Sequence, residues 1–108
     1  MKLPFASRVF KTGNEEIICS FYMPTVDGSD FKCEYHIRSG EKVEKSYACG
    51  VDEVQALILA MQKAHVDLLA SDRYQICGLN WLGLRDLHLP LPPGVKVDDF
   101  RDLPPEGS

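Results

Sequence analysis

Polar and apolar positions alternate without exception between Phe31 and Arg38, with apolar or aromatic residues at the odd positions. This period of two is typical of a strand with one face against a core. Residues 16–23 alternate less cleanly, and residues 6–12 and 42–49 are mixed, so we expect these last two to be less completely buried. The pattern predicts four strands.

Short glycine-containing turns separate the predicted strands, at Gly13-Asn14, Asp27-Gly28 and Ser39-Gly40. Turns of this length join antiparallel neighbours, whereas parallel pairs need a crossover of a dozen or more residues. We therefore expect the four strands to form an antiparallel meander in sequence order.

A helix is predicted from Asp52 to about Asp72. Asp52 is a favourable N-cap, and Gln55 stands at the capping-box position three residues later. Apolar residues then recur at steps of three and four: Val54, Leu57, Ile58, Met61, His65, Leu68 and Leu69. The predicted fold is α+β, with a four-stranded antiparallel meander followed by one long amphipathic helix on one face of the sheet.

The helix carries two further apolar residues, Leu59 and Val66, on the flank of this stripe. Either the C-terminal segment or a partner chain is expected to cover them. The first alternative is favoured because Trp81, Leu82 and Leu84 also need a place to pack. Prolines crowd the chain from Pro90 onward, so we predict one domain over residues 1–88 and a proline-rich tail over residues 89–108 that ends in disorder.

The net charge of −4 and the pI near 5.3 argue against binding to nucleic acid or to an anionic membrane, and favour a basic protein partner. No apolar run approaches the length of a membrane span, and Pro4 interrupts the region where a signal peptide would need one. We expect a cytoplasmic protein with reduced cysteines.

The four cysteines, Cys19, Cys33, Cys49 and Cys77, include no C-x-x-C pair. Zinc sites usually contain such close pairs of ligands, so we expect no metal, and interpret the cysteines as small buried hydrophobic residues. No phosphate-binding glycine motif occurs, and we expect no cofactor.

The histidines also have structural interpretations. His36 lies on the polar face of a predicted strand between Glu34 and Arg38, where a solvated ladder of charges is expected. His65 borders the apolar face of the helix, so we expect a core histidine hydrogen-bonded to Tyr35 or Tyr47. Since no motif of nucleophilic catalysis occurs, we expect no catalytic residues and no enzyme activity.

Three segments resemble a family of small uncharacterised bacterial proteins. They follow the patterns D-G-x-[WF]-x-C-x-[YF]-x-[IV], Y-x-x-G-[VI]-D-x-x-Q-A-L and W-L-G, and here lie at residues 27–37, 47–57 and 81–83. The chain departs from these patterns at Asp30 and in a longer proline-rich end after Leu84. The resemblance implies a bacterial, cytosolic origin and supplies no catalytic residues.

The leading functional hypothesis is a non-enzymatic protein-binding domain, such as an immunity protein or another inhibitor of a basic toxin domain. Acidic side chains would complement such a partner. The candidate partner-binding residues are Glu34, His36, Glu44, Asp98, Asp99 and Asp102.

Two alternatives remain open at this stage. One is a small-molecule-binding or enzymatic domain with a pocket between the sheet and the C-terminal segment, built from Cys77, His65 or Tyr74. The other is a homodimeric structural module that pairs through an edge strand, or through Leu59 and Val66.

Overall fold

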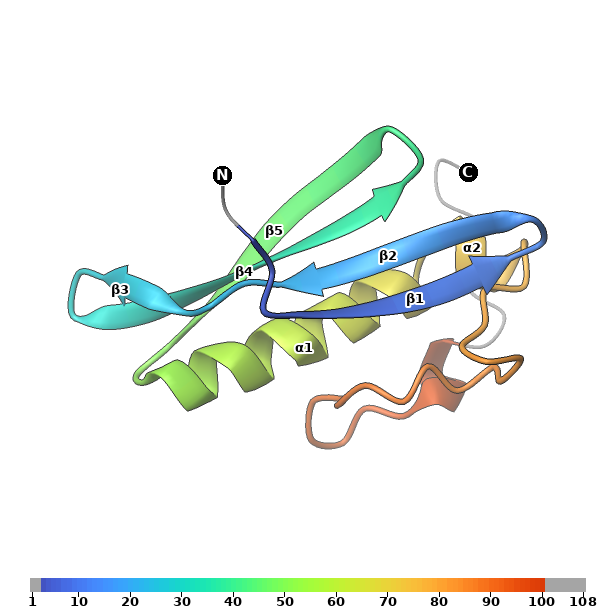
Figure 1. Cartoon of the computed structure of the whole chain (residues 1–108). Coiled ribbons are helices and arrows are strands. Elements are labelled where there is room, and N and C mark those ends of the chain that lie inside the picture. Colours follow the sequence, from blue (N-terminus) through green and yellow to red (C-terminus); the bar gives the residue numbers. More distant parts are fainter. Residues whose placement is uncertain (1–2, 101–108) are drawn as a thin grey trace.

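The computed structural model describes residues 3–100 and has the predicted α+β architecture, with one main helix across one face of an antiparallel sheet (Figure 1). The elements in chain order are β1 (Ala6–Thr12), β2 (Glu15–Phe21), β3 (Thr25–Asp27), β4 (Asp30–Ser39), β5 (Lys42–Gly50), α1 (Glu53–Leu69), α2 (Asp72–Gln75) and the 3-10 helix η1 (Val97–Phe100).

The four predicted strands are adjacent in the predicted order, as β1, β2, β4 and β5. The short strand β3 was not predicted. It pairs with the first residues of β4, while β2 pairs with the second half of the same strand. Pro24 separates β2 from β3, because proline has no N–H to donate to a sheet. The Asp27-Gly28 turn therefore joins β3 to β4 and not the second predicted strand to the third.

The predicted core-facing side of β4, the strand with the strictest alternation, is confirmed. Cys33, Tyr35 and Ile37 of β4 are buried against the core, and Ile17 and Phe21 of β2 are buried beside them. β1 and β5 are less completely buried, as their mixed patterns predicted. Strand periodicity thus identified the core-facing side of the sheet correctly.

The predicted start of α1 is also confirmed. The Asp52 carboxylate accepts a hydrogen bond from the Gln55 backbone N–H at 2.7 Å, and the Gln55 side-chain oxygen accepts one from the Val51 N–H at 2.8 Å. The helix ends at Leu69, three residues earlier than predicted, and Ser71 then caps the short helix α2. Within residues 3–100, no helix has the length and apolar character needed to cross a membrane.

The face of α1 that packs on the sheet matches the prediction in part, because His65, Leu68 and Leu69 are buried, and Leu57 and Met61 pack partly buried against the core. Ala56, Ala60 and Ala64 are fully buried, whereas Val54 and Ile58 are exposed. Alanines at every fourth position bring the helix axis close to the sheet. The contact is tight at Gly50, where a Cβ atom would lie 2.4 Å from the Ala56 nitrogen. Larger side chains do not fit between the two layers here, so two of the predicted inward residues point aside.

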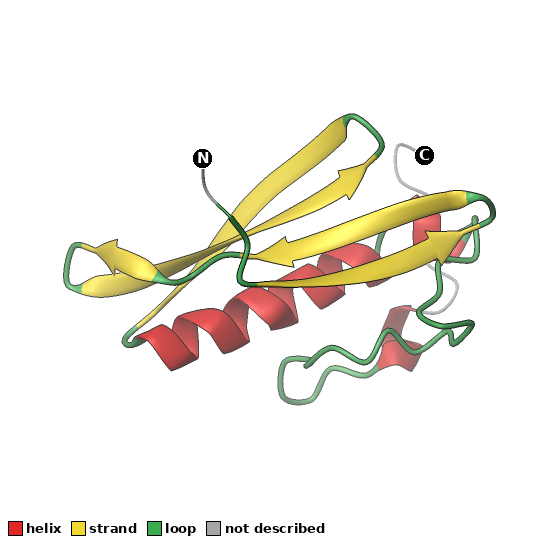
Figure 2. Cartoon of the chain, in the orientation of Figure 1, coloured by secondary structure: helices red, strands yellow, loops and turns green. Residues whose placement is uncertain are grey.

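The C-terminal segment, residues 76–100, forms the rest of the layer beneath the sheet (Figure 2). Two of its leucines, Leu79 and Leu87, are fully buried, and five further residues, among them the predicted Trp81, pack against the core: Trp81, Leu89, Leu91, Val97 and Phe100. The predicted burial of Leu82 and Leu84 is wrong, because both are exposed. On the flank of α1, Leu59 is exposed and Val66 is half-buried, so this flank is covered only in part. The predicted disorder falls on residues 101–108, which lie outside the described residues.

Two arginines attach this segment to the rest of the fold. The Arg8 guanidinium donates to the backbone oxygens of Leu87 and His88, at 3.1 and 2.6 Å, and lies 4.1 Å from the centre of the Trp81 ring. Arg85 donates to the backbone oxygens of Leu79 and Tyr74, both at 3.0 Å. Sequence analysis missed both roles, because the carbonyl groups that accept these bonds have no sequence signature.

Candidate functional site

The face of the sheet turned away from α1, here called the open face, is the candidate functional site. Residues directly opposite one another in a sheet share a face, so the strand register assigns its members. They are Ser7, Val9, Lys11, Glu16, Ile18, Ser20, Tyr22, Lys32, Glu34, His36, Arg38, Val43, Lys45, Tyr47 and Cys49.

His36 lies at the centre of a polar cluster on the open face. Its Nδ1 atom is 3.0 Å from the Tyr22 hydroxyl, and the two rings lie 4.5 Å apart. Its Nε2 atom is 3.8 Å from a carboxylate oxygen of Glu34, an ion pair when the imidazole is protonated. Tyr22 is only 8% exposed although it lies on this face. His36 is therefore held between two side chains. The sequence predicted a solvated ladder of charges here, and this prediction is wrong in that the imidazole is held by Tyr22 and Glu34.

Other side chains of the open face are held in similar ways. The Ser7 and Ser20 hydroxyl oxygens are 2.9 Å apart across β1 and β2. Lys32 places its ammonium 5.2 Å from the centre of the Tyr47 ring, and Lys63 of α1 reaches the same ring at 5.7 Å. These contacts restrict long side chains that would otherwise lose conformational entropy when a ligand binds.

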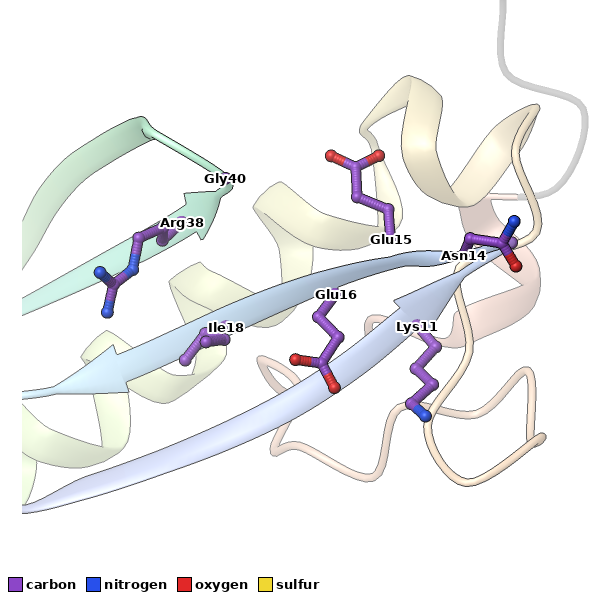
Figure 3. A pocket seen from close by; sticks show the side chains of 8 residues that line it. Lys11, Asn14, Glu15, Glu16, Ile18, Arg38 and Gly40 are labelled. Atoms are coloured by element: carbon purple, nitrogen blue, oxygen red, sulfur yellow. The ribbon is translucent and has the colours of Figure 1, made fainter.

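A groove of about 840 Å³ lies at the end of the open face nearest the β1–β2 and β4–β5 turns (Figure 3). Lys11, Glu16, Ile18 and Arg38 project into it from three strands, and the turns complete its lining. Lys11 pairs with Glu16 across β1 and β2, and Ile18 pairs with Arg38 across β2 and β4. The groove thus offers both signs of charge beside an apolar side chain.

The charge of the open face differs from that of the whole chain. Four basic residues, Lys11, Lys32, Arg38 and Lys45, share it with two acidic residues, Glu16 and Glu34. The chain as a whole has a net charge of −4. The acidic excess therefore lies elsewhere in the molecule.

Of the predicted partner-binding residues that the structure describes, only Glu34 and His36 lie together. Glu44 pairs with Ile37, so it lies on the helix-facing side of the sheet, where its carboxylate is 3.7 Å from Arg73. Asp98 and Asp99 belong to η1 in the C-terminal segment. Asp102 lies outside the described residues. The described members of the predicted acidic surface are therefore not one patch, because alternation in β5 places Glu44 on the other face.

The residues of the predicted small-molecule pocket are also separated. Tyr74 lines a pocket of about 290 Å³ together with Arg85, Asp86, Val97 and Asp98. Neither His65 nor Cys77 lines that pocket, and Cys77 is exposed.

His65 is a core histidine, as predicted, but its expected tyrosine partners are wrong. The Nδ1 atom of His65 is 3.2 Å from the Pro90 backbone oxygen. Burial lowers the pKa of His65, although this hydrogen bond acts in the opposite direction. The Tyr35 hydroxyl instead donates to Asp67, and burial together with this bond raises the pKa of Tyr35.

The prediction of four buried cysteines holds for two of them. Cys19 and Cys33 are buried, and Cys49 and Cys77 are exposed. Burial raises the pKa of Cys19 to about 12, so its thiol stays protonated at neutral pH. Among residues 3–100, no group of three or more His, Cys, Asp or Glu side chains is placed to hold a metal ion.

The comparison with protein families identifies the chain's family. Residues 6–91 match the domain of unknown function DUF6968. The chain belongs to this family. The match spans the whole sheet, α1, α2 and much of the C-terminal segment. No curated protein and no solved structure matched the chain. An uncharacterised domain family agrees with the resemblance seen in the sequence, and the motif patterns and the bacterial origin remain predictions.

Proposed function

We propose that this protein is a non-enzymatic domain that binds another protein through the open face of its sheet. The observation that carries the proposal is the groove formed by Lys11, Glu16, Ile18 and Arg38, which is continuous along β4 with the ordered cluster around His36. α1 and the C-terminal segment pack on the other face and leave this one available to a partner.

The composition of the open face is suited to protein recognition. Interfaces combine aromatic residues and arginine with polar groups, and here Tyr47 and Arg38 stand among hydroxyl and charged side chains. The contacts of Tyr22 with His36, and of Lys32 with Tyr47, hold these groups in place before binding. Such preorganisation lowers the entropy lost on association.

The charge of this face also bears on the partner. Net charge alone favours a basic partner, but the four basic residues of the open face favour a partner segment with acidic or mixed charge. An inhibitor of a toxin, as an immunity protein is, remains the most concrete form of the proposal. In that form, the toxin surface docked on the groove carries carboxylates opposite Lys11 and Arg38.

The first experiment compares protein capture by the wild type, Arg38→Gln and the matched control Lys96→Gln. Lys96 is exposed on the C-terminal segment, away from the open face. We expect a protein from lysate of the source organism to be retained by the wild type and by the control, and lost by Arg38→Gln. Capture that is the same for all three variants would contradict the proposal.

Calorimetry with the purified partner then measures the effect. Arg38→Gln is expected to raise the dissociation constant at least about tenfold, or ~1.4 kcal/mol, because arginines are enriched among the residues that contribute most to the binding free energy of interfaces. If the partner is a toxin, co-expression of the wild type restores growth and co-expression of Arg38→Gln does not. Equal protection by both would show that the groove is not the docking site.

A further inference from the structure

The outer edge of β5 is a candidate pairing surface, and the inference drawn from it does not depend on the proposed function. Within the described residues, β5 pairs with β4 on one side only. The two strands are joined by a two-residue turn, Gly40-Glu41, with Gly40 at a φ of +61°. After such a turn, Ser39 and Lys42 form a hydrogen-bonded pair, and hydrogen-bonded pairs then alternate along the ladder.

This alternation determines which backbone groups of β5 face the open edge. The odd residues Val43, Lys45 and Tyr47 direct their N–H and C=O groups away from β4. One contact supports this assignment, because the Lys63 ammonium reaches around the edge and donates to the Tyr47 oxygen at 3.1 Å. A lysine at this position protects an edge strand from pairing. The part of the edge before Ser46 lacks that protection.

The residues of this unprotected part are antisymmetric in charge. The last residue of the turn and the first four residues of β5 read Glu41-Lys42-Val43-Glu44-Lys45, and all five are exposed. When this segment is placed antiparallel to a copy of itself with Val43 at the centre, each lysine faces a glutamate. A shift of the centre by one or two residues, in either direction, places a lysine or a glutamate opposite its own copy. Charge therefore selects a single register.

We propose that a second copy of this chain pairs antiparallel with β5 about Val43, so that the two sheets become one continuous sheet with two-fold symmetry. Val43 exchanges two backbone hydrogen bonds with Val43 of the second copy. Lys42 faces Glu44 of the second copy on the helix side of the sheet. Lys45 lies next to Glu41 of the second copy, which is the last residue of that copy's β4–β5 turn.

The side chains are available for this pairing. Val43 is 41% exposed and gains a matching apolar neighbour. Lys42 already lies 3.8 Å from Glu44 within the same copy, but both side chains are largely exposed. Exposed pairs of this kind contribute little, so exchanging this contact for one between copies costs little. The opposite edge of the sheet differs, because β1 is bridged at Lys11 by Asn80.

Charge reversal tests the register. Sedimentation velocity over a concentration series measures the dimer dissociation constant of the wild type, Glu41→Lys, Lys45→Glu and the double reversal. Glu41 and Lys45 are both exposed. Each single variant places like charges together at two symmetric positions. We therefore expect the dimer dissociation constant to be at least about tenfold higher than that of the wild type. The double reversal restores opposite charges and is expected to return within about threefold of the wild type.

A disulfide tests the centre of symmetry. Hydrogen-bonded antiparallel pairs have Cα atoms about 5.5 Å apart, within the range of a disulfide. In a Cys49→Ser, Cys77→Ser background, we expect Val43→Cys to form a covalent dimer on mild oxidation. The matched control is Val9→Cys on β1, because Val9 is 43% exposed and also lies on an edge strand. It is expected to crosslink at least about tenfold more slowly.

Four results would overturn the inference, and the first three concern the wild type, the double reversal and the crosslinking. They are a wild-type protein that stays monomeric at the highest concentration studied, a double reversal that dimerises no better than the single variants, and equal crosslinking at Val43→Cys and Val9→Cys. A dimer that survives both single reversals would likewise exclude this register.

Discussion

The two faces of the sheet differ in how their side chains are held. On the helix side, packing dominates: Phe10, Ile17, Leu68 and Leu69 are almost completely buried. On the open face, order comes from pairwise polar contacts, such as the contact of Tyr22 with His36. The helix side therefore supplies most of the stability by burying apolar area, and the open face presents ordered groups to solvent. Substitutions on the two sides should differ accordingly.

The largest difference is expected from truncating a buried leucine. Leu68→Ala leaves a cavity beneath the sheet and should lower the free energy of unfolding by about 2–5 kcal/mol. Val9→Ala on the open face should cost less than about 1 kcal/mol, because Val9 is already half exposed. Urea denaturation of both variants measures the difference. Similar losses would show that the open face is covered by packing as well.

The close approach of α1 to β5 gives the second prediction. Gly50→Ala places a methyl group against the backbone of Ala56 and should cost about 1–3 kcal/mol, since the helix must shift to admit it. Val51→Ala, at the exposed neighbouring position, should change stability by less than about 0.5 kcal/mol. Thermal or urea unfolding compares them. An unchanged midpoint for Gly50→Ala would mean that the helix does not pack this closely.

The polar contacts of the open face should contribute less. Tyr22→Phe removes the hydroxyl bonded to His36 and should cost about 0.5–1.5 kcal/mol. Tyr47→Phe, on the same face, is the control, because the Tyr47 ring contacts two ammonium groups without using its hydroxyl. Its stability should stay within about 0.5 kcal/mol of the wild type in urea. Equal effects of the two substitutions would show that the Tyr22–His36 hydrogen bond does not contribute to the free energy of unfolding.

The last prediction separates the two histidines as pH falls. Burial lowers the pKa of His65 below its ordinary value of 6.5, so below that pH the unfolded chain binds this proton more readily than the folded one. The free energy of unfolding should therefore fall as pH drops below 6.5. His65→Gln should reduce this dependence, and His36→Gln on the open face should retain it. Urea titrations at pH 5 and pH 7 measure this change in the free energy of unfolding. If the same change remains in His65→Gln, another group causes it.

The accuracy of the sequence predictions follows the range of the interactions involved. Alternation in β4 and the Asp52–Gln55 cap are local, and both were predicted correctly. The face of α1 was predicted less well, because apolar periodicity gives weight to Val54 and Ile58 and little to alanine. The recurrence of Ala56, Ala60 and Ala64 was the available signal, and its meaning depends on how closely the sheet approaches.

The candidate site shows the same limit. Glu34 and His36 share a strand and a face, so alternation alone placed them together. The groove combines residues from β1, β2 and β4, and its lining depends on the pairing register of three strands. Glu44 was misplaced for that reason, since only the pairing of β5 with β4 shows which way it faces.

The sequence by itself determined the four long strands, the main helix and the α+β class, because the periods of two and about 3.6 and the capping residues act over a few positions. Only the tertiary structure decided which charges share the open face, which group His65 contacts and how the C-terminal segment is attached. Those outcomes depend on contacts between residues far apart in the chain, such as Arg8 with Leu87, which no local pattern encodes.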